Sequence, residues 1–93
     1  MTIDDLAKKL KEKSKNYVVV KDNELSFTIC YKPPFFEKDD DPIELFHVEY
    51  DEDMSKTEWC AESKEATFLL NLNQINLLDY PLSLLKELDK PVL

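Results

Sequence analysis

The chain has 93 residues, of which 43% are hydrophobic and 34% charged, so residues 1–93 have the size and composition of a single globular domain. The absence of glycine excludes phosphate-binding loops, dinucleotide-binding fingerprints, nucleophile elbows and standard calcium loops, all of which require it. One histidine and two cysteines are too few for a four-ligand zinc site built from these residues alone.

The net charge limits the partners of the chain. Twenty acidic residues against twelve lysines, with no arginine, give a net charge of −8. Such a chain is poorly suited to nucleic acid or anionic membranes, so a partner selected by charge should be a basic protein surface. The acidic first residues do not resemble a signal peptide, and no apolar run reaches the roughly 20 residues that cross a bilayer. Because Cys30 and Cys60 make no disulfide framework, we expect a cytoplasmic protein with reduced thiols.

The first element in chain order is a helix from Thr2 to about Asn16. Thr2 and Asp5 form a pair typical of a capping box, and acids precede lysines in the order that the helix dipole favours. The lysines are expected on a solvated face. The apolar side chains at helical spacing are Ile3, Leu6, Ala7 and Leu10.

Residues 17–32 predict a β-hairpin. A β-branched run follows Tyr17, and Asp22 with Asn23 supplies the turn. Alternation then predicts one face with Leu25, Phe27, Ile29 and Tyr31 and an opposite face with Ser26, Thr28, Cys30 and Lys32.

A long connection follows, opened by Pro33 and Pro34, which cannot donate to a sheet. Phe35 and Phe36 stand here before the acidic run 37–41. They either pack back on the core or stay exposed as a partner-binding tip.

Further strands are predicted at 43–50, with Phe46, Val48 and Tyr50 on one face, and at 57–62, with a possible fifth strand at 66–72. Residues 74–80 are ambiguous. Pro81 suits the first turn of a last helix that ends at Pro91 and has the apolar stripe Leu82, Leu84, Leu85 and Leu88. The expected fold is a single α+β domain: an N-terminal helix, a four- or five-stranded antiparallel meander and a C-terminal helix. Both helices are expected on one face, against Leu25, Phe27, Ile29, Phe46, Val48 and Tyr50.

The charge is concentrated in the middle of the chain. Residues 1–32 hold seven lysines and five acids, whereas residues 37–53 hold nine acids and one lysine, a net charge of −8 that equals that of the whole chain. This acidic segment either only keeps the domain soluble or docks on a basic groove, such as the nucleic-acid channel of another protein. Alternate strand residues lie about 6.6–6.8 Å apart, roughly twice the spacing of nucleotides along one DNA strand. The candidate partner-binding residues are Phe35, Phe36, Asp39, Asp40, Asp41, Glu49, Asp51, Glu52 and Asp53.

Metal binding and catalysis find less support in the sequence. The positions of a calcium loop fall on Asp51, Asp53, Ser55, Thr57 and Glu62, but Lys56 occupies the position that requires glycine, so we expect no metal site and no cofactor. His47 should lie on the outer face of the sheet, and Cys30 and Cys60 should be small sheet residues, so we expect no enzyme.

The two ends of the chain, Met1–Ala7 and Leu84–Leu93, resemble small phage or prophage proteins of Gram-positive bacteria, which have no assigned biochemical function. The first helix and the acidic character are also similar to Cas9-inhibiting anti-CRISPR proteins that mimic DNA. These resemblances imply a helix–meander–helix fold and the genomic context of a mobile element. The function that we expect is a non-enzymatic, protein-binding inhibitor. The alternative is a homo-oligomeric structural or accessory protein whose acidic segment only keeps it soluble.

Overall fold

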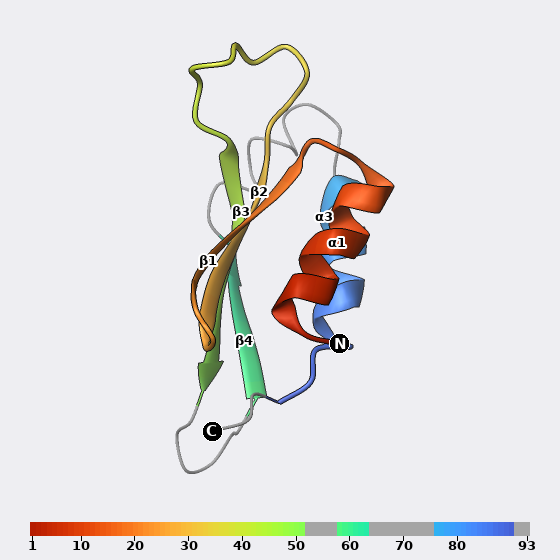
Figure 1. Cartoon of the computed structure of the whole chain (residues 1–93), viewed down its shortest axis with the longest axis vertical. Helices are drawn as coiled ribbons and strands as arrows, with labels where there is room; N and C mark the ends of the chain where they lie inside the picture. The colour runs from red at the N-terminus through yellow and green to blue at the C-terminus, as the bar shows by residue number, and fades with distance from the viewer. Residues whose placement is uncertain (52–57, 64–75, 91–93) are drawn as a thin grey trace.

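The structure, a computed structural model, describes residues 1–51, 58–63 and 76–90. Figure 1 shows an antiparallel sheet with two helices on the same face, and the strand order is β1-β2-β3-β4. The predicted α+β architecture is therefore confirmed with four strands, whereas the possible fifth strand at 66–72 lies outside the described residues. The elements are helix α1 (Ile3–Lys13), strands β1 (Tyr17–Asn23), β2 (Ser26–Tyr31), β3 (Ile43–Asp51) and β4 (Glu58–Ser63), and helix α3 (Asn76–Leu85).

Helix α1 begins with the predicted capping box. The Thr2 hydroxyl accepts a hydrogen bond from the backbone N–H of Asp5 at 3.1 Å, and the Asp5 carboxylate accepts one from the backbone N–H of Thr2 at 3.1 Å. The hydrogen bond from the Thr2 backbone lowers the pKa of Asp5 below its ordinary value. The helix ends at Lys13, before the predicted stop at Asn16, and its inward side chains are Ile3, Leu6 and Leu10.

A β-bulge in β3 changes which residues reach the core. Ile29 pairs with Phe46 but Cys30 pairs with Glu44, so Leu45 is the extra residue opposite β2. The bulge lets Leu45 and Phe46 point inward together, and Leu45 is completely buried although the alternation had not selected it. The bulge also leaves Glu44 on the opposite face.

The core lies between the sheet and the two helices. Four of the six core residues predicted on the sheet, Phe27, Ile29, Phe46 and Val48, are buried, while Leu25 and Tyr50 are half-buried. Tyr17 is also buried, with its ring edge-to-face against Tyr31 at 5.2 Å between centroids, and this burial raises the pKa of Tyr17 to about 12. The buried apolar cluster comprises Ile3, Leu6, Leu10, Tyr17, Phe27, Ile29, Tyr31, Ile43, Leu45, Phe46, Val48, Leu78 and Leu84.

Helix α3 differs from its prediction. Pro81 lies inside the helix rather than in its first turn, and Leu82 is 40% exposed instead of belonging to the inward stripe. The other residues of the predicted stripe are confirmed: Leu84 is buried, and Leu85 and Leu88 pack against the core. Leu78 and Pro81 are buried in addition. An interior proline costs a helix about 3 kcal/mol because it removes a hydrogen bond, and here the burial of residues on both sides of it compensates. The helix ends at Leu85; Pro91, its predicted end, lies outside the described residues.

The segment after α3 connects distant parts of the chain. The backbone N–H of Asp89 donates to the carbonyl of Met1 at 2.8 Å, and the Trp59 indole N–H donates to the carbonyl of Asp89 at 2.9 Å. Met1, which precedes α1, and Asp89, which follows α3, are thereby joined to Trp59 of β4.

Neither described helix has the length and apolar character needed to cross a membrane.

Candidate functional site

The outer face of the sheet is the face opposite the two helices (Figure 1), and the strand register brings carboxylates of neighbouring strands together on it. The strand register places Thr28 opposite His47 and His47 opposite Glu62, and it places Glu49 opposite Cys60. Because directly paired residues point to the same side of a sheet, these side chains share the outer face. Glu44, Glu49 and Glu62 are exposed there and Asp51 is half-buried. We call Glu44, Glu49, Asp51 and Glu62 the acidic face.

His47 lies within the acidic face and is held at both ring nitrogens. Its Nδ1 is 3.0 Å from the Thr28 hydroxyl, and its Nε2 is 2.9 Å from a carboxylate oxygen of Glu49. These contacts join β2 to β3 and orient the carboxylate of Glu49. His47 therefore lies on the outer face of the sheet, as predicted.

The order hydroxyl, imidazole, carboxylate is also that of a nucleophilic triad, which needs a substrate cavity beside the hydroxyl. Two cavities of the described structure, of about 380 and 330 Å³, are lined by other residues. The contacts of Thr28 and Glu49 with His47 form a link between β2 and β3.

The predicted acidic segment is divided by the fold. Asp39, Asp40 and Asp41 are exposed in the connection between β2 and β3, which extends beyond one end of the sheet (Figure 1), whereas Glu49 and Asp51 lie toward the opposite end of β3. The Asp40 carboxylate accepts the backbone N–H of Glu37 at 2.8 Å, and so stabilises its own turn. The structure thus separates the two acidic groups.

The two phenylalanines of the connection have different environments. Phe35 is 64% exposed, whereas Phe36 is half-buried and packs against the core cluster. Their rings are in edge-to-face contact at 5.2 Å between centroids. Phe36 therefore packs back on the core, as the first alternative predicted, and Phe35 is exposed, as the second required.

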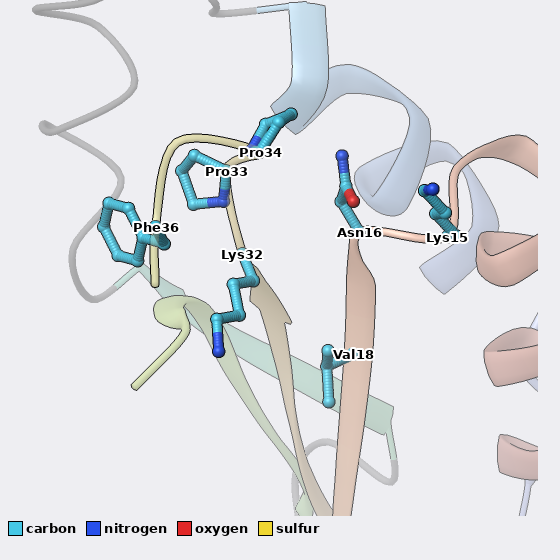
Figure 2. A pocket seen from close by; sticks show the side chains of 7 residues that line it. All are labelled: Lys15, Asn16, Val18, Lys32, Pro33, Pro34 and Phe36. Atoms are coloured by element: carbon cyan, nitrogen blue, oxygen red, sulfur yellow. The ribbon is translucent and has the colours of Figure 1, made fainter. Parts of the chain in front are cut away.

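Figure 2 shows a cavity at the corner where β1 begins and β2 ends. The charged side chains that line it are those of Lys15 and Lys32, and the Lys32 ammonium donates to the backbone carbonyl of Lys38 at 2.9 Å. Its other lining residues are Asn16, Val18, Pro33, Pro34 and Phe36. This corner therefore carries charge opposite to that of the acidic face.

The cationic side chains of α1 lie on the other side of the molecule. Helix α1 covers the inner face of the sheet, so its exposed side points away from the acidic face (Figure 1). The exposed lysines of this helix are Lys8, Lys9, Lys11 and Lys13. The helix also exposes Asp4, Asp5 and Glu12, so its four lysines and three acids give a net charge of +1, against −4 for the four carboxylates of the acidic face.

The described residues contain no group of three or more His, Cys, Asp or Glu side chains placed to hold a metal ion. Of the calcium-loop positions, Asp53, Ser55, Lys56 and Thr57 lie outside the described residues, as does the partner-binding candidate Glu52. Cys30 is buried and Cys60 exposed, and neither is in a disulfide. Cys30 pairs with Val18 and Glu44 on the face opposite Phe27 and Ile29, as predicted, and it is buried there in a central strand beside the bulge.

Two members of the acidic face, Glu44 and Glu62, were not predicted as part of it. Simple alternation along 43–50 puts Glu44 in phase with Phe46 and Val48, and only the bulge at Leu45 reverses its direction. The adjacent apolar pair Leu45 and Phe46 is the signal of this change of phase.

Comparison of the chain with protein-family models, with curated proteins and with solved structures gave no match.

Proposed function

We propose that the chain is a non-enzymatic protein-binding module that docks its acidic face on a basic surface of another protein. The observation that carries this proposal is the concentration of negative charge on one face: exposed carboxylates of two adjacent strands share the outer face, whereas helix α1, on the other face of the sheet, has a net charge of +1. A molecule with this distribution is oriented by the field of a basic partner before contact. The proposed role is that of an inhibitor encoded by a phage or prophage.

The spacing of the carboxylates supports a partner that binds nucleic acid. Glu49 and Asp51 are alternate residues of β3 on the outer face, so their backbone positions are about 6.6–6.8 Å apart. This is about twice the 3.4 Å between successive nucleotides of a DNA strand. Strands lie about 4.8 Å apart, which places Glu62 of β4 beside this row. A lysine or arginine surface arranged for phosphates would find carboxylates at comparable intervals.

The position of His47 agrees with a binding role. Its two ring nitrogens face Thr28 and Glu49, which fixes a side chain in the middle of the acidic face. A preorganised carboxylate loses less conformational entropy on binding than a mobile one.

The experiment is a pull-down from a bacterial lysate with the tagged chain at low and high salt, followed by purification of the captured protein. A face variant, E44Q/E49Q/E62Q, is compared with a tip variant, D39N/D40N/D41N, which removes the same amount of charge from the connection between β2 and β3. The proposal expects capture by the wild type and the tip variant at low salt, loss at high salt, and weak capture by the face variant. Equal capture by both variants contradicts it.

A further inference from the structure

Strand β1 forms one edge of the sheet, with β2 as its neighbour. One side of its backbone is bonded to β2, and the other side faces away from the sheet. Edge strands offer backbone N–H and C=O groups to another strand, and proteins usually protect them with charges, prolines or short length. Strand β1 has seven residues and no proline.

The hydrogen-bonding pattern between β1 and β2 identifies the backbone groups of β1 that face away from β2. The backbone N–H of Lys32 donates to the carbonyl of Asn16 at 2.9 Å, so Asn16 faces β2. Because neighbouring residues of an antiparallel strand alternate in direction, Val18 and Val20 face β2, whereas Val19 and Lys21 face outward. In the part of the chain that the structure describes, the outward backbone groups of Val19 and Lys21 have no hydrogen-bond partner.

The side chains of β1 are apolar around Val19, whose outward backbone groups have no hydrogen-bond partner in the described structure. Val18, Val19 and Val20 are consecutive, Val20 is 48% exposed, and the other two are half-buried. The charged residues of the strand, Lys21 and Asp22, come after this run. The middle of β1 therefore lacks the charges that usually prevent strands from pairing at their edges.

We propose that β1 pairs antiparallel with β1 of a second copy around a two-fold axis at Val19, which extends the sheet through both copies. Pairing centred on Val19 matches the outward backbone groups and puts Val18 opposite Val20 of the second copy. Pairing centred on Val20 would also place outward backbone groups opposite each other, but it would put Val18 opposite Asp22 of the second copy. Apolar β-branched pairs stabilise a sheet more than a valine opposite a carboxylate, so the valine run selects the first register.

The charge distribution permits this contact between two acidic chains. Residues 1–32, which include β1, hold seven lysines against five acids, whereas the acidic face lies on β3 and β4. Strand β3 is two strands away from the edge, about 10 Å, which exceeds the screening length of about 8 Å at physiological salt. At low salt the screening length is longer, about 30 Å at 0.01 M, and the two chains of charge −8 repel each other, so added salt should strengthen the pairing. This inference does not rest on the proposed partner complex, which salt should weaken.

The first test is sedimentation equilibrium of the full chain from about 1 µM to about 1 mM, at low and high salt. We expect a monomer–dimer equilibrium that salt shifts toward the dimer. Val20→Lys should raise its Kd at least roughly tenfold by placing a charge in the pairing edge. The matched control, Leu82→Lys, changes another exposed apolar side chain and should leave the Kd within about twofold. A monomer throughout, a dimer weakened by salt, or equal effects of the two variants would overturn the proposal.

A second test does not depend on affinity and determines the register. Directly opposed residues that share a hydrogen-bonded position have Cα atoms about 5.5 Å apart, within the range that a disulfide spans. In a Cys60→Ser background, Val19→Cys should form a covalent dimer under mild oxidation at least about tenfold faster than Val20→Cys. Faster cross-linking by Val20→Cys, or no difference between the two variants, would overturn pairing about Val19.

Discussion

Replacement of Phe27 by alanine tests the packing of the sheet against the helices. Phe27 is completely buried near the start of β2, opposite Val48, and its ring contacts Trp59 edge-to-face with the centroids 5.7 Å apart. Loss of a buried phenylalanine costs about 3–5 kcal/mol, and the whole domain should have roughly 5–14 kcal/mol at 0.05–0.15 kcal/mol per residue. With about 4–8 °C per kcal/mol for a domain of this size, Tm should fall by about 12–40 °C.

The assay is thermal unfolding followed by circular dichroism, with Phe35→Ala as the matched control. Phe35 has the same side chain at 64% exposure, so its removal should change the free energy of unfolding by less than about 0.5 kcal/mol. A melt of Phe27→Ala within a degree or two of the wild type, or equal effects of the two variants, would refute the assignment of Phe27 to the core.

Three further predictions concern stability. Thr2→Ala should cost about 0.5–2 kcal/mol through loss of the capping box, measured by urea unfolding; full stability in this variant would argue against the cap. Leu45→Ala should cost about 2–5 kcal/mol because the bulge buries this side chain, and a cost as small as that of Leu82→Ala, measured alongside, would contradict the bulge. Burial raises the pKa of Tyr17 from 10.0 to about 12, so the folded state keeps a proton that the unfolded state loses. Stability should therefore be full below pH 10 and fall by roughly 2–3 kcal/mol toward pH 12, and a Tyr17→Phe variant with the same fall would exclude Tyr17 as the cause.

The sequence predicted the elements whose signals are local. The capping pair of Thr2 and Asp5 lies within one helical turn, and the alternation around Phe27 lies within one strand, so each could be interpreted without knowledge of distant contacts. The outer position of His47 followed from the same alternation. The order of strands followed because strands that are consecutive in the chain usually pair as neighbours.

The features that were missed depend on tertiary contacts. The bulge at Leu45 arises from the pairing of β3 with β2, and it determines that Glu44 joins the acidic face. The position of Pro81 inside α3 depends on the burial of the residues around it, which propensity cannot describe. Likewise, Asp40 belongs to a turn at one end of the molecule, so the number of acids along the chain overstates how many share one surface.

The most direct test of the proposed docking is the rate of association of the captured partner with the wild type, the face variant and the tip variant at about 20 and 200 mM salt. Charge at an interface acts mainly on this rate. We predict that E44Q/E49Q/E62Q associates at least about tenfold more slowly at low salt and that its rate depends little on salt, while D39N/D40N/D41N keeps the wild-type rate and salt slope. Equal rates and equal salt slopes for all three proteins would contradict it.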